Sequence, residues 1–300
     1  MENVHRPLTS APIVHYPDAI TLRSRVYDFL RLGKYAEACA HCIAAANHGD
    51  AEAQYLLGLT FKMGCDAGQF LPDTYYNEAL RALYLASKSG HQQATFELGR
   101  YCYFQIQDYN EARHYFDMLD PLNAARNLEL SSSQLAEANS CLGTIYCSNP
   151  SSQHDIDRGI LHYTRGAELG DAHARFLLAY TELYICTPAR TESGLEHLRQ
   201  AAIQGHPEGQ FAFGCHLAQE GRLDEATYCF QCAAELGHPT ANQYLGNRFA
   251  IVDPSLAQGY YKHAIQLGCT ESVELLKHLL QQYPQLETAN GLPNWGSSYG

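Results

Sequence analysis

The feature that most constrains this chain is a recurring glycine set among small residues, plainest in AIQGHPEGQFAFG (202–214) and AELGHPTANQYLG (234–246). With that glycine as position 0, the residue at +4 is small in every copy, and the residue at +9 is Gly or Ala in every copy but the last. A fixed period of this length is typical of helical repeat proteins. The glycines are Gly49, Gly90, Gly170, Gly205, Gly237 and Gly268, and Gln134 takes the same place in a degenerate copy.

Small residues also recur before the glycine, at −4 and −11, with a larger residue at −7 in most copies. Positions −11, −7 and −4 share one stripe of a helix, and +4, +8 and +12 share another. Each repeat is therefore predicted to be two antiparallel helices, with the glycine ending the second in a left-handed conformation. We expect Asp50 and Asp171 to cap the helix that follows, and His206 and His238 to act at this corner rather than in catalysis.

One hairpin of this kind cannot cover its own apolar face, but a stack of hairpins buries a continuous core. The predicted fold is all-α, a right-handed superhelical solenoid of antiparallel helix pairs with about six to seven repeats. We expect an irregular N-terminal lead over residues 1–19, the solenoid over 20–283 and an irregular tail over 284–300. Two insertions interrupt the rhythm, at 65–73 and at 119–134, and the second is the expected bend or break in the stack.

The repeat resembles a known family in AEAQYLLG (51–58), AELGDAHARFLLA (167–179), EHLRQAAIQG (196–205) and YCFQCAAELG (228–237). These segments are similar to the Sel-one-like repeat, a relative of the tetratricopeptide repeat, which LGKYAEA (32–38) and EGRLDEATYCF (220–230) resemble more. The resemblance spans about residues 33–283 and departs from the pattern at 181–191. It implies an adaptor or scaffold that holds a peptide or protein along a concave face.

Charge narrows the expected partners. The chain has 20 Lys and Arg against 32 Asp and Glu, a net charge of −12, which disfavours nucleic acid and anionic membrane surfaces. The residues read from the first Met show neither a secretory signal nor an apolar run long enough to span a membrane, so we expect a cytoplasmic protein. Export as a bacterial effector that acts as an adaptor in a host cell is an alternative. The oligomeric state is not predicted.

No motif for catalysis is found, and we expect neither an enzyme nor a cofactor. The pairs Cys39/Cys42 and Cys229/Cys232 have a metal-ligand spacing, but they lie far apart in the stack and each offers two ligands, so we interpret them as reduced packing residues and predict no metal site. The alternative is an enzyme, or a metal- or haem-binding protein, that uses the solenoid as support.

A second stripe of the first helix, at +3, +6, +10 and +14, is expected to face the groove, by analogy with tetratricopeptide units. The +6 aromatics have a second interpretation as packing between repeats, and the +3 acids a second interpretation as a solvated face. We predict that a protein or peptide segment, extended or helical, apolar with some basic residues, lies along this groove. The candidate groove residues are Glu52, Tyr55, Phe96, Arg100, Phe104, His173, Phe176, Tyr180, Tyr184, Glu208, Phe211 and Asn247.

Overall fold

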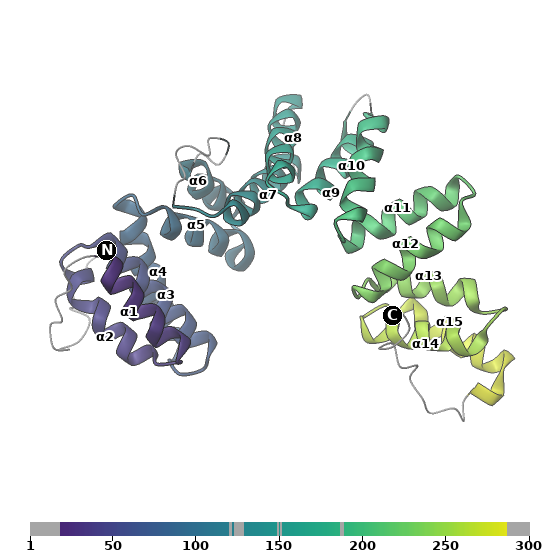
Figure 1. The fold of residues 1–300 in the computed structure, drawn as a ribbon, viewed down its shortest axis with the longest axis horizontal. Helices are drawn as coiled ribbons and strands as arrows, with labels where there is room; N and C mark the ends of the chain where they lie inside the picture. The colour runs from purple at the N-terminus through teal and green to yellow at the C-terminus, as the bar shows by residue number, and fades with distance from the viewer. Residues whose placement is uncertain are drawn as a thin grey trace. The chain divides into compact units, whose positions relative to one another are not determined.

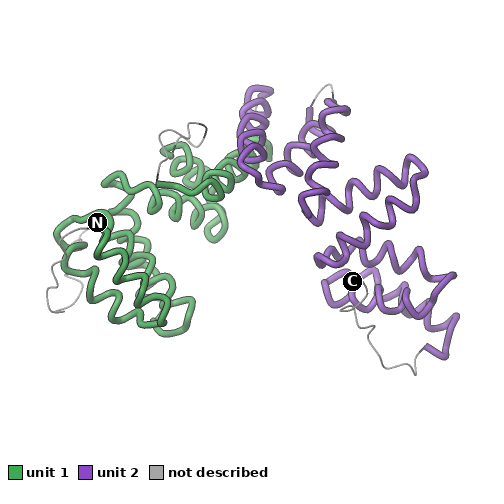
Figure 2. The backbone as a smooth tube through the Cα atoms, in the orientation of Figure 1, with its two compact units in different colours: residues 1–150 green, residues 151–300 purple. Residues whose placement is uncertain are grey.

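The structure is a computed structural model that describes residues 19–119, 122, 129–148, 150, 152–186 and 189–286. Within those ranges the chain is helical apart from its turns and connecting segments, as the sequence predicts. None of the described helices is both long and apolar enough to cross a membrane. The chain divides into two compact units, unit 1 over residues 1–150 and unit 2 over residues 151–300 (Figure 2).

Unit 1 builds its core where consecutive helices pack side by side (Figure 1). The helix α3 packs on both α2 and α4, and Leu56, Leu57 and Leu83 are buried between them. Its described helices are α1 (Ala19–Arg31), α2 (Tyr35–Asn47), α3 (Ala51–Asp66), α4 (Pro72–Lys88), α5 (Gln92–Tyr101), the π-helical turn η1 (Cys102–Ile106), α6 (Tyr109–Leu119) and α7 (Ser132–Ser148).

Unit 2 repeats the same arrangement, with α9 on α10, α11 on α12 and α13 on α14 as successive pairs. Phe230 and Leu245 are fully buried in its core. Its described helices are α8 (Gln153–Glu168), α9 (Ala172–Tyr180), the π-helical turn η3 (Thr181–Ile185), α10 (Thr191–Ile203), α11 (Pro207–Gln219), α12 (Leu223–Glu235), α13 (Pro239–Phe249), α14 (Pro254–Gln266), α15 (Glu271–Gln282) and the short 3-10 turn η4 (Pro284–Leu286).

The recurring glycine lies at the corner between pairs, as predicted. All six glycines have a left-handed backbone, with φ from 81° at Gly205 to 95° at Gly170. At Gly205 the amide donates to the Ala202 carbonyl, and the next amide, of His206, donates to the Ala201 carbonyl, which closes the end of α10. The predicted caps are also present, because Asp50 accepts from the Ala53 amide at 2.7 Å and Asp171 accepts from the His173 amide at 2.9 Å. The corner therefore turns the chain with its terminal backbone groups satisfied.

The prediction that Gln134 replaces the corner glycine is wrong. The helix α7 already begins at Ser132, so Gln134 lies in its first turn. Its amide donates to Ser131 Oγ at 3.2 Å, and its Oε1 accepts from the Ser131 amide at 2.9 Å. This is a capping box, in which two side chains satisfy each other's backbone amides at a helix start. Residues 1–18 and 287–300, and half of the second insertion, lie outside the described residues, so the domain boundaries remain a prediction.

Candidate partner-binding surface

Three of the predicted groove residues in unit 1 are buried. The carboxylate of Glu52 on α3 accepts a hydrogen bond from Arg23 Nε on α1 at 2.6 Å and lies 3.0 Å from Nε2 of His91. It is therefore engaged in contacts within unit 1. Tyr55 is 6% exposed and Phe96 is 1% exposed. In unit 1 the +6 aromatics thus pack between helices, which is the second of the two interpretations that the sequence left open.

Arg100 and Phe104 lie at the solvent side of α5 and η1. Arg100 Nε donates to Glu137 Oε1 on α7 at 2.6 Å, and its guanidinium also lies 6.0 Å from the centre of the Phe104 ring. Phe104 is half exposed. Glu97, beside Arg100, accepts from Lys62 on α3 at 2.9 Å, so ion pairs link the successive first helices of unit 1. Of the five predicted positions in this unit, Phe104 offers the most free surface.

Unit 2 presents the clearest exposed aromatic pair of the predicted groove. Tyr180 ends α9 and is 48% exposed, and Tyr184 in the turn η3 is 71% exposed. Their ring centres lie 5.0 Å apart. Both π-helical turns follow the first helix of a pair, and each carries a +14 aromatic, Phe104 or Tyr184, into solvent. Turns of this type are frequent at functional sites.

Histidines at three of the corners join one helix pair to the previous one by stacking on the +6 aromatic. His206 stacks on Phe176 with ring centres 4.9 Å apart, and His238 stacks on Phe211 at 4.5 Å. His91 stacks on Tyr55 in the same way in unit 1. These contacts leave Phe176 and Phe211 half-buried. In unit 2 the +6 aromatics therefore pack between helices and still present part of their rings to solvent.

The same histidines cap helices, which explains the corner role predicted for His206 and His238. Nδ1 of His206 accepts from the Gly209 amide at 3.1 Å, and Nδ1 of His238 accepts from the Ala241 amide at 3.1 Å. A neutral ring with its proton on Nε2 is required, since a protonated Nδ1 cannot accept. Burial lowers the pKa of both rings, which favours this neutral form.

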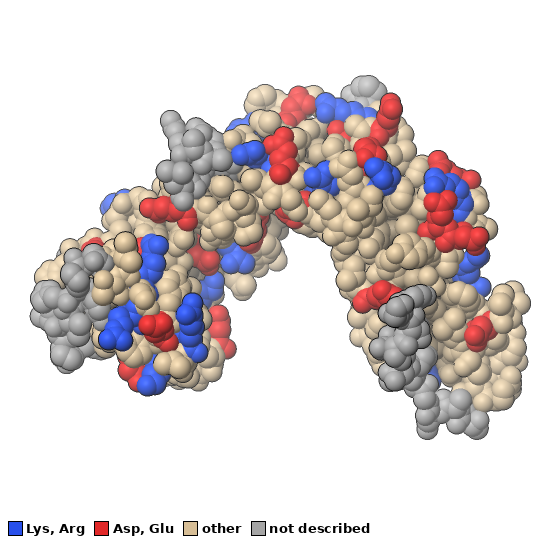
Figure 3. All heavy atoms as spheres, viewed as in Figure 1, with Lys and Arg blue, Asp and Glu red and all other residues tan. Residues whose placement is uncertain are grey.

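The remaining predicted positions of unit 2 lie near these corners. His173, at +3 on α9, is exposed, and its Nδ1 lies 3.1 Å from Nε2 of His206. Glu208 is exposed, while Asn247 accepts from the Tyr261 hydroxyl at 2.7 Å on the surface of α13. On the face shown in Figure 3, basic and acidic side chains of the described residues are interspersed.

A polar column at +5 was missed by the sequence analysis. Four of its six side chains donate to a carbonyl eight residues back, in the last turn of the preceding helix. Gln54 donates to the Ala46 carbonyl at 3.2 Å, and Asn242 donates to the Ala234 carbonyl at 3.4 Å. The signal was available, because every copy but the last has a polar residue there, directly after the small residue at +4. The column is Gln54, Thr95, Asn139, Arg175, Gln210 and Asn242.

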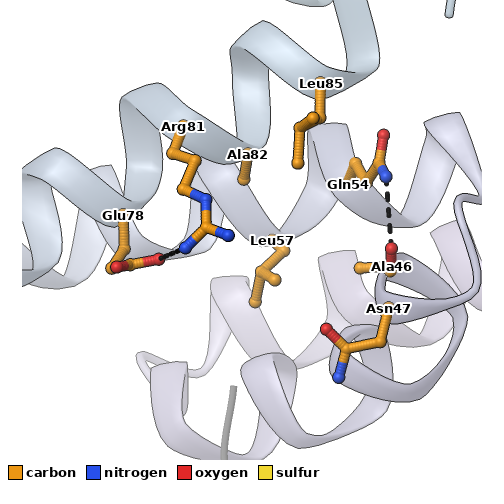
Figure 4. A pocket seen from close by; sticks show the side chains of 8 residues that line it. All are labelled: Ala46, Asn47, Gln54, Leu57, Glu78, Arg81, Ala82 and Leu85. Atoms are coloured by element: carbon orange, nitrogen blue, oxygen red, sulfur yellow. Dashed lines mark hydrogen bonds and ion pairs between the residues drawn. The ribbon is translucent and has the colours of Figure 1, made fainter. Parts of the chain in front are cut away.

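Gln54 also lines a small pocket of about 50 Å³ between α2, α3 and α4 (Figure 4). The amide nitrogen of Gln54 points to Ala46. Glu78 and Arg81 lie at the opposite end of the pocket, with Arg81 Nη1 3.6 Å from Glu78 Oε2. Among the described residues no donor bonds to the buried Gln54 Oε1. This pocket lies apart from the predicted groove residues, and none of them lines it.

The cysteines are all free thiols, and most are buried. Burial raises the pKa of Cys39 to about 12, which keeps that thiol protonated and unreactive. Cys229 and Cys232 on α12 are partly exposed. Within the described ranges, no group of three or more His, Cys, Asp or Glu side chains is arranged to hold a metal ion.

Comparison with known proteins identifies the fold. No protein-family model matches the sequence, and no curated protein matches it either. A protective antigen of uropathogenic Escherichia coli with an SLR fold matches over 90% of this chain, with a TM-score of 0.67 and 19% identity. The chain has the Sel1-like (Sel-one-like) repeat fold. A Sel1 repeat protein from Oxalobacter formigenes matches over 86% of this chain and 98% of its own length, with a TM-score of 0.58 and 18% identity.

The Sel1-like fold confirms the expected architecture of stacked helix pairs. The chain spans 59% of the length of the E. coli antigen. At these identities the likeness concerns the fold alone. A fold does not by itself determine a function, so any partner must be inferred from the surface of the chain itself.

Proposed function

We propose that this Sel1-like protein is an interaction scaffold that binds a peptide or protein segment across the first helices of unit 2. The observation that carries the proposal is the exposed pair Tyr180 and Tyr184, two large rings 5.0 Å apart on the predicted groove stripe. Tyrosine gives a binding surface a large apolar area at a small cost in conformational entropy, together with a polar hydroxyl.

The chemistry of the partner follows from the surroundings of this pair. Phe176 and Phe211 add half-buried apolar surface, and Glu208 adds an exposed carboxylate whose side chain is 57% exposed. The net charge of −12 favours association with cationic segments. The proposed ligand is therefore an apolar segment with some basic residues, held by aromatic contact and oriented by charge.

A comparison of captured proteins tests the proposal. The full chain and the variant Tyr180→Ala/Tyr184→Ala are used as baits in cell extract, and bound proteins are compared by quantitative mass spectrometry. We expect a specific partner of the unchanged chain to be lost from the variant by tenfold or more, as is typical when two aromatic anchors are removed. The control is Tyr228→Ala, which removes an exposed tyrosine from α12. Equal capture by all three baits, with unchanged circular dichroism, would reject the surface.

A further inference from the structure

We propose that His206 is a pH-sensitive latch between two successive helix pairs of unit 2, and that its protonation releases His173 and Phe176. Phe176 belongs to the proposed binding surface, and His173 is one of the groove residues predicted from the sequence. The latch itself is independent of any partner, and its effect on binding rests on the proposed function.

The neutral ring of His206 makes three contacts at once. Nδ1 accepts from the Gly209 amide at the start of α11, Nε2 lies 3.1 Å from His173 Nδ1 on α9, and the ring stacks on Phe176 at an interplanar angle of 20°. Because Nδ1 accepts, the ring proton lies on Nε2 and is donated to His173. One imidazole thus joins the beginning of α11 to two side chains of the preceding pair.

A second proton can enter the ring only at Nδ1, because Nε2 already carries one. Protonation converts Nδ1 from an acceptor into a donor, so the Gly209 amide loses its cap. Glu208 Oε2 lies 3.5 Å from Nδ1 and can accept the new N–H. Rotation of the ring toward Glu208 would draw it away from both His173 and Phe176.

The charged and titratable groups that face His206 determine the pH at which its ring is protonated. His173 and Asp171 approach from α9 and its cap, and Glu208 approaches from α11. Burial and the imidazole of His173 oppose the proton, while the two carboxylates favour it, and the pKa of His206 is lowered overall by burial. The neutral latch is therefore fully closed above a pH of about 6.5, and its contribution is lost as the pH falls toward the lowered pKa.

The corner at His238 has the same helix cap and ring stacking as the corner at His206, and the corner at His206 has one further contact. His238 also caps a helix through Nδ1 and stacks on Phe211. Glu208 is the charged group that acts on His238 from α11. His206 differs because an exposed histidine, His173, receives its Nε2 proton, so that two imidazoles and a carboxylate meet at a single corner.

Nitrogen NMR of the histidine rings of the full chain tests the latch directly. At pH 7.5 we expect His206 to show an unprotonated Nδ1 and a protonated Nε2, with a titration midpoint below 6.5. The reverse tautomer, or a midpoint at or above 6.5, would overturn the proposal. This measurement uses the unmodified chain and does not depend on the folding of any variant.

The variant His206→Asn tests the energetic consequence, because Asn keeps a capping oxygen but has no proton to gain in this range. When the pH is lowered from 7.5 to 5.5, the melting temperature of the unchanged chain should fall further than that of His206→Asn. The difference between the two falls should be about 2–4 °C, which is the shift that loss of one helix cap produces in a domain of this size. His154→Asn, which changes an exposed histidine of α8, should fall as the unchanged chain does. Equal falls in all three would overturn the latch.

Capture of the partner at the two pH values separates the latch from the proposed function. If the latch and the binding surface are both correct, the unchanged chain captures different amounts of the partner at pH 7.5 and pH 5.5. His206→Asn captures the same amount at both pH values. Capture that does not depend on pH, with His206 titrating as above, would overturn the regulatory step. Capture that is insensitive to Tyr180→Ala/Tyr184→Ala at pH 7.5 would reject the binding surface, while the NMR and melting results would still decide the latch.

Discussion

At the scale of single residues, contact between a glycine and a large side chain sets the distance between the two helices of a pair. A Cβ on Gly214 would lie 2.9 Å from Cε1 of Phe230, and one on Gly246 would lie 2.5 Å from Cε1 of Tyr261. Both rings are buried. The small residue at +9 and the large residue at −7, recognised as separate columns in the sequence, are therefore two halves of one contact.

This contact predicts the cost of enlarging Gly214. The variant Gly214→Leu should lose about 1–3 kcal/mol of unfolding free energy, because the fully buried Phe230 leaves no room for a larger side chain. The measurement is chemical denaturation followed by circular dichroism. Gln219→Leu, on the exposed end of the same helix, serves as the control and should stay within about 0.5 kcal/mol. Equal stability of the two variants would contradict the close approach.

Glu52 gives unit 1 a defined dependence on acid. Burial alone would raise its pKa, but hydrogen bonds from Arg23 and His91 lower the pKa to about 2. A carboxyl with a lowered pKa stabilises the folded state above its unfolded value near 4.5, and this contribution is lost as the pH falls toward 2. Unfolding free energies measured from pH 6 to 3 should therefore fall less steeply for Glu52→Gln than for the unchanged chain. Parallel curves would show that the carboxylate has no such role.

At the scale of helices, polar side chains add a second donor to carbonyls that already accept from the corner glycine amides, as at Ala46 and Ala234. Asn242 donates to both the Ala234 and His238 carbonyls, and its Oδ1 lies 3.1 Å from Nδ1 of His263 on α14. A buried amide of this kind connects three helices. The +5 column thus complements the glycine corner, since it supplies donors to carbonyls near the end of the preceding helix.

Loss of this amide should be costly. Asn242→Ala is expected to lower the unfolding free energy by about 1–3 kcal/mol, because it removes the hydrogen bonds of a buried amide to two carbonyls and to the His263 imidazole. The neighbouring Gln243→Ala, on a half-exposed side of α13, should change stability little. Thermal unfolding of both variants provides the comparison. A Gln243 variant as unstable as the Asn242 variant would contradict the role of the buried amide, since Ala has the higher helix propensity at both positions.

The helical period of the sequence does not predict the two π-helical turns, η1 and η3. Phe104 and Tyr184 keep the spacing of a regular helix in the sequence, so nothing in the period predicts a wider turn. In the structure the Asp108 amide donates to the Cys102 carbonyl, and the Cys186 amide donates to the Thr181 carbonyl, as each turn ends. The sequence predicted which aromatic lies on the stripe, and the local backbone decides how far that aromatic extends into solvent.

At the scale of the whole chain, repetition is the reason that the fold could be predicted and the site only in part. Packing positions are the same in copy after copy, so six copies reinforce one assignment. Surface positions differ between copies, and their exposure depends on neighbours that periodicity does not specify. Phe96 and Phe176 occupy the same column, yet one is fully buried and the other is half-buried against His206. The histidine cap was expected only as an undefined corner role, because a cap requires a particular tautomer and ring orientation.

Site-specific photocrosslinking at residue 184 tests the central claim most directly, that the exposed aromatic stripe of unit 2 holds a partner. A photoreactive phenylalanine analogue replaces Tyr184 in the full chain, and in a second protein it replaces Tyr228 on α12, an exposed tyrosine that is not part of the stripe. We predict a discrete covalent adduct from position 184, which is lost when Tyr180 is changed to Ala, and no such adduct from position 228. An adduct from position 228 alone, or equal adducts from both positions, would contradict the account.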